Sequence, residues 1–311
     1  MEQIINPIPR EKILAELTED KFLRKTNAIN NDIYIIDANN SPNIMLEIGR
    51  LREITFRAAS GGTGKSVDID EFDTGDTPFK QLIVWNAEEQ EIISSYRFIL
   101  GKDVPLDKNG YPHTPTSELF EFSQRFIENE WQKTIELGRS FVQPKYQATN
   151  NMRIGLFSLD NMWDGLGTLI VDYPEMEYFF GKMTMYNTYN RIARNMIFNY
   201  LNKHFKGDET LVKPFNPTHH IRHTRKANAQ ILSGNTLAED FKLLNQGIRN
   251  IKTSIPPLIK AYMTLSSTMQ YFGASANPGF GEVEEIAILV TIKDIYEQIF
   301  NRHVKTYKNQ E

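Results

Sequence analysis

The amino-acid sequence predicts an α/β (α+β) fold, with a mixed central β-sheet flanked by helices and a helical insertion. Segments with helical spacing of apolar residues alternate irregularly with short β-type runs. Two of these runs are separated by the spacer NAEEQ, as expected for a hairpin. No internal repeat or long linker divides the 311 residues. We therefore expect one domain over 1–311, with a polar, helical insertion at 206–250.

The first half of the chain contains most of the predicted strands. Ile44, Ile48 and Leu51 lie on one helical stripe, whereas DIYII at 32–36 is a compact β-type run that ends at turn-forming residues. The strand predicted at 133–142 is interrupted near Gly138. The resulting prediction is helices at 10–25 and 43–56, and strands at 32–36, 79–85, 91–100 and 133–142.

The second half is richer in predicted helices. The segment 190–205 is strongly amphipathic, and prolines at 256 and 257 suit the first turn of a helix. Residues 206–235 are polar and contain two further prolines and a basic cluster. The resulting prediction is helices at 156–171, 190–205, 256–272 and 294–300, and strands at 177–185 and 284–292.

Composition excludes several classes of function. The net charge of −4 gives no case for nucleic-acid binding. The absence of cysteine rules out disulfides, cysteine nucleophiles and thiolate metal sites. The N-terminus lacks a signal-peptide pattern, and no apolar stretch reaches the roughly 18 residues needed to span a bilayer. We expect a cytoplasmic protein, with peripheral contact at the inner membrane face left open.

The run ASGGTGKS at 59–66 approaches a phosphate-binding loop, but its context argues against that function. Such a loop follows a strand and opens a helix, so that loop amides and the helix N-terminus cradle phosphates together. Here the preceding LREITFRAA has helical spacing, and the following VDIDEFDTGD is acidic. The better interpretation is a glycine loop beside a substrate cleft.

Charged residues within apolar surroundings form the main candidate site. Glu136 and Arg139 lie in the strand-like ELGRSFV, Arg97 lies near a strand end, and Asp70 and Asp73 lie in an acidic loop. A buried, unpaired charge costs several kcal/mol, so we expect these side chains to pair with one another. The residues alone leave two alternatives open, a structural ion-pair network and a catalytic site.

The order of motifs adds a resemblance. LRxxxFR, DxDEFD, a hairpin ending in YR and ELGRSFVxPxYQ resemble the ornithine-lipid-synthase (hemolysin-like) branch of the GNAT acyltransferases, and more distantly the acyl-homoserine-lactone synthases. LFSLDNMWDGLG, EYFFGKMTM, IPPLIKAYMTL and NPGFGEVEEIAIL extend the resemblance to about residue 292. The chain looks most like Bacteroidetes members that make glycine lipids and other N-acyl amino acids.

The resemblance implies a GNAT-like sheet, an acyltransferase activity and a role for each matched residue. Glu136 would be the general base, and Arg139, Asp70 and Asp73 would complete the catalytic set. The substrate-binding residues would be Arg52, Phe56, Phe72, Arg97, Ser140, Phe141 and Val142. An ammonium must lose a proton before it attacks a thioester, and a desolvated glutamate suits that step. Main-chain donors near Ser140–Val142 would stabilise the oxyanion.

The implied reaction transfers a long-chain fatty acyl group, with or without a 3-hydroxyl, to the amine of an amino acid such as glycine or ornithine. No cofactor or metal is expected beyond an acyl thioester co-substrate, either acyl-ACP or acyl-CoA. The glycines of the usual GNAT pyrophosphate loop are missing from QPKYQATNNMRIG, which favours acyl carrier protein. Relatives often carry a histidine where this chain has Gln81.

Further candidates remain. HHIRHTRK at 219–226 suits docking to acidic carrier protein or anionic lipid better than metal binding. Phe157, Met162 and Trp163 suit a core better than an acyl tunnel, whereas half of the strand containing Phe179, Phe180, Met183 and Met185 could line one. The alternative functions are an acyl-homoserine-lactone-like signal synthase and a non-catalytic GNAT-fold protein that binds lipid or carrier protein.

Overall fold

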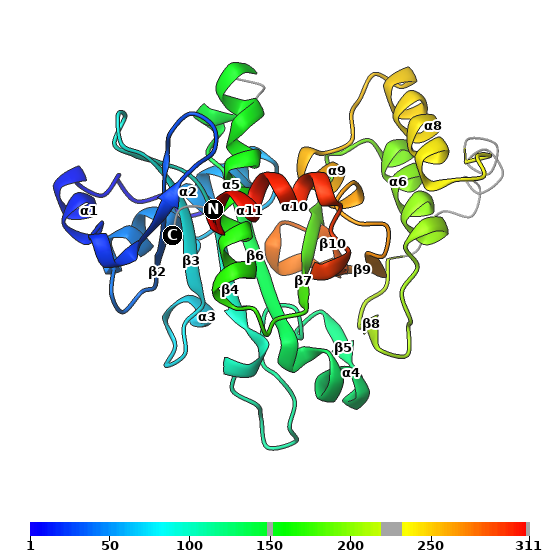
Figure 1. Cartoon of the computed structure of the whole chain (residues 1–311), viewed down its shortest axis with the longest axis horizontal. Helices are drawn as coiled ribbons and strands as arrows, with labels where there is room; N and C mark the ends of the chain where they lie inside the picture. The colour runs from blue at the N-terminus through cyan, green and yellow to red at the C-terminus, as the bar shows by residue number, and fades with distance from the viewer. Residues whose placement is uncertain (148–151, 219–231, 309–311) are drawn as a thin grey trace.

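A computed structural model describes residues 1–147, 152–218 and 232–308. Its centre is an eight-stranded sheet with the strand order β1-β2-β3-β4-β6-β7-β10-β9 (Figure 1). Every neighbouring pair is antiparallel except β6 and β7, which run parallel. A parallel pair needs a crossover connection, and the long helix α5 supplies it. The predicted mixed sheet with flanking helices is confirmed.

The strands are bounded as follows: β1 Phe22–Lys25, β2 Asp32–Ile36, β3 Lys80–Asn86, β4 Glu91–Leu100, β5 Phe120–Phe122, β6 Thr134–Val142, β7 Tyr178–Met185, β8 Val212–Pro214, β9 Gln270–Asn277 and β10 Val283–Thr291. The α-helices are α1 Arg10–Glu16, α2 Pro42–Ala58, α3 Glu71–Thr74, α4 Gln124–Asn129, α5 Met152–Asp172, α6 Arg191–His204, α8 Leu237–Asn250, α9 Pro257–Met263, α10 Glu297–His303 and α11 Lys305–Lys308. Strands β5 and β8 form a separate two-stranded sheet.

Two predicted helices are wrong in their second halves. The helix expected at 10–25 ends at Glu16, and Phe22–Lys25 instead forms the edge strand β1, paired with β2. The helix expected at 256–272 ends at Met263, and Gln270–Asn277 forms the edge strand β9, paired with β10. In both places pairing with a neighbouring strand overrides a local apolar spacing, because tertiary contacts outweigh weak propensity.

Helices cover both faces of the sheet. On one face, Met162, Leu166 and Leu169 of α5 share a buried cluster with alternate residues of β3 and β4, such as Leu82 and Phe98. On the other face, the apolar stripe of α2 packs against the intervening strand residues, including Ile83 and Trp85. Strand residues alternate between faces, so each strand contributes to both cores. The view in Figure 1 shows α5 and α10 crossing the near side of the sheet.

The parallel pair β6 and β7 separates before either strand ends. Their pairing runs from Thr134 opposite Tyr178 to Leu137 opposite Gly181 and stops there. Beyond that point β6 stays paired with β4 as far as Val142, and β7 stays paired with β10 as far as Met185. Two strands that diverge within one sheet leave an opening between them. This opening positions the candidate site.

The region predicted as an insertion contains β8 and the amphipathic helix α8, which packs on α6. Its basic run HHIRHTRK lies outside the described residues. Among the described helices, none combines the length and the apolar character that a membrane span requires.

Gly181 allows β7 to pass close to β6 at the last paired position. A β-carbon built at Gly181 would lie 2.6 Å from the carbonyl oxygen of Leu137. We expect Gly181→Ala to lower the free energy of unfolding by about 1–3 kcal/mol, as for other overpacked sites. Urea unfolding measures this change. Gly279→Ala is the control, since its nearest atom would be Asn277 Oδ1 at 3.5 Å. Equal losses in the two variants would contradict the close approach.

Candidate active site

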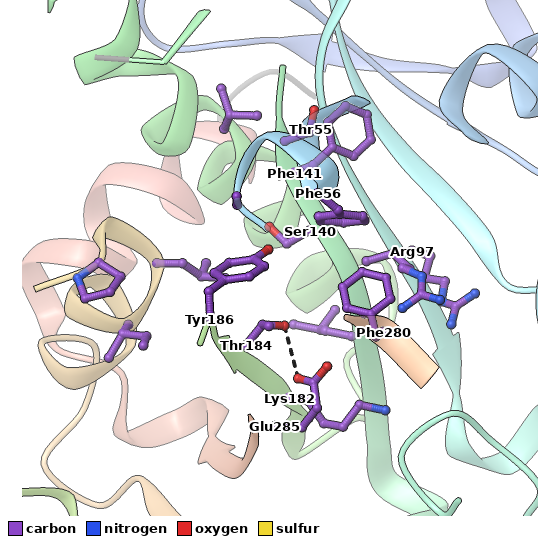
Figure 2. Close-up of a pocket in the computed structure, with 18 of the residues that line it drawn as sticks. Thr55, Phe56, Arg97, Ser140, Phe141, Lys182, Thr184, Tyr186, Phe280 and Glu285 are labelled. Carbon is purple, nitrogen blue, oxygen red and sulfur yellow. Dashed lines mark hydrogen bonds between the residues drawn. The ribbon is translucent and has the colours of Figure 1, made fainter. Parts of the chain in front are cut away.

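A cavity of about 590 Å³ occupies the opening between β6 and β7 (Figure 2). Its volume is in the range of about 300–1,000 Å³ typical of small-molecule sites. Residues Glu136 to Val142 of β6 form one wall, and Lys182, Thr184 and Met185 of β7 form another. Phe56 of α2, Leu159 and Met162 of α5, Ile259 of α9 and Phe280 complete much of the remainder.

The cavity has a polar end and an apolar end. Glu136, Lys182, Thr184 and Glu285 come from the three neighbouring strands β6, β7 and β10, and they share one face of the sheet by strand register. Leu137, Met162, Met185 and Ile259 belong to the core on the opposite face. The cavity therefore passes through the sheet and joins a charged compartment to an apolar one.

A β-bulge re-aims the residues at the centre of β6. Ser95 of β4 lies opposite Phe141 and Arg97 lies opposite Gly138, so Arg139 and Ser140 together face the single residue between them. Arg139 has a φ of 48°, an uncommon left-handed conformation for a residue with a side chain. The sequence-predicted interruption near Gly138 is this bulge.

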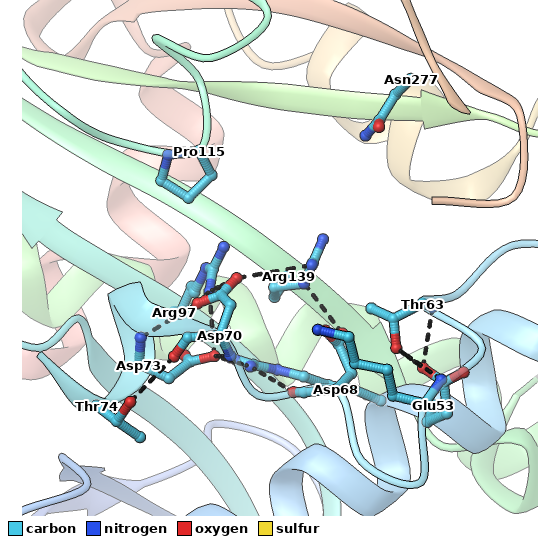
Figure 3. A network of polar contacts seen from close by, with 12 residues as sticks. Glu53, Thr63, Asp68, Asp70, Asp73, Thr74, Arg97, Pro115, Arg139 and Asn277 are labelled. Carbon is cyan, nitrogen blue, oxygen red and sulfur yellow. Dashed lines mark hydrogen bonds and ion pairs between the residues drawn. The ribbon is translucent and has the colours of Figure 1, made fainter. Parts of the chain in front are cut away.

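Arginines and aspartates form a network beside the polar end (Figure 3). Arg97 donates to both carboxylate oxygens of Asp70 at 2.8 Å and to Asp73 at 3.2 Å. Arg52 donates to Asp73 at 2.9 Å and to the side-chain oxygen of Gln81 at 2.7 Å. Gln81 in turn donates to Asp73 at 3.0 Å, so its amide bridges an arginine and an aspartate.

Arg139 joins the same network from the bulge. Its Nε lies 3.0 Å from Asp68 Oδ2, and its Nη2 lies 3.7 Å from Asp70 Oδ2. The ring of Phe280, from the turn between β9 and β10, lies 4.4 Å from its guanidinium carbon. Two carboxylates and an aromatic ring thus hold Arg139 in its strained backbone conformation.

The network shifts the proton affinities of its members. Burial acts to raise the pKa of Asp73, but Arg52 and Arg97 outweigh it and hold the pKa well below its ordinary value. Burial acts to lower the pKa of Arg97, and Asp73 and Asp70 more than reverse that effect. For Asp68, burial dominates over Arg139 and the pKa is raised.

Glu136 lies outside this network. One of its carboxylate oxygens accepts a hydrogen bond from the Thr116 hydroxyl at 2.5 Å, and the other has no hydrogen-bond partner within the described chain. Burial raises the pKa of Glu136, and Lys182 is the strongest opposing influence. No ion pair joins Glu136 to Arg97 or Arg139 among the described residues, unlike the mutual pairing expected from sequence. A buried carboxylate with a free oxygen is chemically suited to accept a proton.

The structure separates the sequence-predicted residues into two groups. Those that line the cavity are Glu136, Arg139, Phe56, Arg97, Ser140, Phe141 and Val142. Arg52, Phe72, Asp70 and Asp73 do not line it and act on it through Arg97 and Arg139. Phe72, for example, lies beneath the Arg97 guanidinium, with 5.9 Å between the ring centroid and Cζ.

Several cavity residues were missed from the sequence. Lys182 and Thr184 lie in EYFFGKMTM and Glu285 lies in NPGFGEVEEIAIL, but no role was assigned to them from the sequence. The alternation in EYFFGKMTM does place Lys182 and Thr184 on one face. Of the four strand residues considered for an acyl channel, Met185 lines the cavity and Phe179, Phe180 and Met183 do not. Asp68 was overlooked within DxDEFD, where its burial was not evident.

The glycine loop at 59–66 is held by a carboxylate of the protein itself. The Glu53 carboxylate accepts from the amides of Thr63 and Gly64 at 3.1 and 2.7 Å and from the Thr63 hydroxyl at 2.9 Å. The loop follows helix α2 rather than a strand. Amides that already bind an internal anion are not available to cradle a phosphate, which agrees with the interpretation from sequence.

A parallel strand pair that diverges, with a bulge in one of its two strands, is the arrangement of an acyltransferase of the GNAT class. Residues 51–155 match the family model of the acetyltransferase (GNAT) domain. The chain is 52% identical to a glycine N(alpha)-acyltransferase of Bacteroides thetaiotaomicron over 99% of this chain and 91% of that protein. It is 49% identical to one of Phocaeicola vulgatus over 100% of this chain and 95% of that protein.

The chain therefore belongs to the GNAT N-acyltransferase family that includes these two enzymes, and it is an N-acyltransferase. A solved structure of a CoA-dependent acyl-homoserine lactone synthase with SAM and isopentyl-CoA also matches, at 11% identity and a TM-score of 0.39 over 90% of each chain.

Removing the charge of Asp73 tests the network. We expect Asp73→Asn to lower the free energy of unfolding by about 3–5 kcal/mol at pH 7, because Arg52 and Arg97 lose a buried partner. The depressed pKa of Asp73 contributes stability above the unfolded value of about 3.9, and that stability is lost as the pH falls. The difference in the free energy of unfolding between variant and wild type should therefore shrink by about 1.4 kcal/mol per pH unit below about pH 4.

Urea unfolding at pH 7, 5 and 3 measures both effects. Asp76→Asn, at an exposed position three residues further along the same loop, is the matched control. A difference in unfolding free energy between Asp73→Asn and wild type that stays constant down to pH 3 would contradict the charge pairing.

Proposed function

We propose that this N-acyltransferase transfers a long-chain fatty acyl group from a thioester on acyl carrier protein to the amine of glycine. The observation that carries the proposal is the cavity through the sheet, which joins a polar compartment around Glu136 to an apolar one. The names of the two relatives, at about half identity over nearly the whole chain, support glycine as the acceptor.

The shape of the cavity suits a long acyl chain. Its apolar end lies among α5, α9 and the core side of β7, where Leu159, Met162 and Ile259 line it. Each buried methylene of an acyl chain contributes about 0.8 kcal/mol, so this compartment favours a long donor over acetyl. The thioester carbonyl would then lie at the divergence of the strands, where β6 is no longer paired with β7 beyond Leu137.

The chemistry needs one base and no covalent nucleophile. The glycine amine attacks the thioester carbonyl and forms the C–N bond, and Glu136 accepts the proton that the nitrogen loses. The tetrahedral intermediate then expels the thiolate as the C–S bond breaks, and the thiolate takes up a proton. Main-chain N–H groups of Ser140–Val142 would stabilise the oxyanion, and Arg139 would meet the acceptor carboxylate.

Carrier protein is favoured over CoA by the loop after β6. The segment Gln143–Gln147 turns away as a 3₁₀ helix whose flanking glutamines donate to carbonyls of Ile92 and Val142. Without the glycines of the usual pyrophosphate loop, the backbone cannot wrap a diphosphate closely.

The reaction itself is the direct test. Purified protein should release free thiol from long-chain acyl carrier protein when glycine is present and not when it is absent, because transfer needs the acceptor amine. Thiol release and mass spectrometry of the N-acyl product measure the reaction. Ornithine, serine and alanine as acceptors and acyl-CoA as donor are the comparison arms. Faster turnover with another acceptor, or with acyl-CoA, would overturn that part of the proposal.

Glu136→Gln tests the base. The amide keeps the shape and the Thr116 contact but cannot accept a proton, so kcat should fall by about 10²–10⁴ with little change in KM. Steady-state kinetics on folded variant measure the loss. Glu88→Gln, an exposed residue at the tip of the β3–β4 hairpin, is the matched control. Wild-type turnover in the Glu136 variant would remove it from the mechanism.

A further inference from the structure

Lys182 is a charged residue of the cavity that the proposed reaction does not use. It lies in β7, one position beyond the last residue paired with β6, and its side chain lines the polar end. Its ammonium donates a hydrogen bond to the main-chain carbonyl of Pro115, in the loop before β5. A buried ammonium costs free energy unless its charge has a partner.

Strand register places Lys182 between two carboxylates. Glu136 lies opposite Phe180, two residues before Lys182, and Glu285 lies opposite Thr184, two residues after it. Residues two apart on a strand share a face, so all three side chains point into the same compartment as diagonal neighbours. Figure 2 shows Lys182 and Glu285 together at the polar end of the cavity, where the Thr184 hydroxyl donates a hydrogen bond to Glu285.

The electrostatic influence between Lys182 and Glu136 is mutual. Burial lowers the pKa of Lys182 to about 8, opposed first by Glu285 and then by Glu136, while Arg139 and Arg97 add to the lowering. Burial raises the pKa of Glu136, and Lys182 opposes that rise more than Thr116 or Arg97 does. Lys182 is therefore the main positive charge acting on the proposed base.

We propose that Lys182 is a positioning residue whose ammonium, anchored on the Pro115 carbonyl and balanced by Glu285, keeps the Glu136 carboxylate ionised and ready to accept the amine proton. This inference rests on the proposed role of Glu136 as the base. It adds a residue to which the resemblance assigned no role, and it gives the buried Glu285 a function. It also makes the pH at which Glu136 loses its proton depend on the charge of Lys182.

The pH profile of kcat tests the proposal. Wild type should lose activity on the acidic side as Glu136 takes up a proton. In Lys182→Met this acidic limb should move up by about one to two pH units, as for the loss of a nearby positive charge. Lys182→Arg should keep the acidic limb in place, since arginine retains the charge. Lys133→Met, at an exposed lysine just before β6, is the matched control.

A fall in kcat with the acidic limb unmoved would show a merely structural role and overturn the proposal. So would an unchanged profile. If Lys182→Met does not fold, Lys182→Gln decides instead, because its amide can donate to the Pro115 carbonyl but carries no charge. Its acidic limb should also move up, and a limb that stays in place refutes the inference. The proposed function fails separately, if wild type releases no thiol with glycine or if Glu136→Gln is fully active.

Discussion

The divergence of β6 from β7 is the constraint on which the rest of the site depends. Where the strands are paired, from Thr134 to Leu137, the sheet is closed and separates the hydrophobic core on one face from that on the other. Where pairing stops, a cavity opens that reaches both faces, so one ligand can have a charged end and an apolar end in different environments. Gly181 makes the last close contact possible, and α5 provides the crossover that a parallel pair requires.

An opening in a sheet leaves backbone without strand partners, so the strands beside it need support from side chains. The arginine–aspartate network gives that support on the β6 side. Arg97 from β4 and Arg139 from the bulge both reach the loop that carries Asp68, Asp70 and Asp73. The capping box between Asp70 and Asp73 holds this loop as the short helix α3. The network thus fixes the wall of the cavity, while Glu136 stays outside it with one carboxylate oxygen free.

Most of the fold could be predicted from the sequence, and so could the site residues on β6 and in the acidic loop. Strands such as 32–36 and 91–100, the helix over 43–56 and the bulge near Gly138 could be predicted because their apolar spacing or their glycine is local. The edge strands β1 and β9 could not, since their pairing partners and not their own residues decide their form. Lys182 and Glu285 were missed for a similar reason. Each is unremarkable in its own strand and becomes part of a site only through register with a neighbour.

The distribution of charge explains why the chain uses two separate clusters rather than one. Three arginine guanidiniums beside Glu136 would hold it so firmly ionised that it would be a weak base, since proton transfer works best when the affinity lies near the working pH. Pairing those arginines with aspartates satisfies their charge elsewhere. The single ammonium of Lys182, itself weakened by burial, then offsets only part of the cost of burying Glu136. In the proposed mechanism this balance leaves Glu136 able to accept the amine proton, in a compartment that is continuous with the apolar end of the cavity.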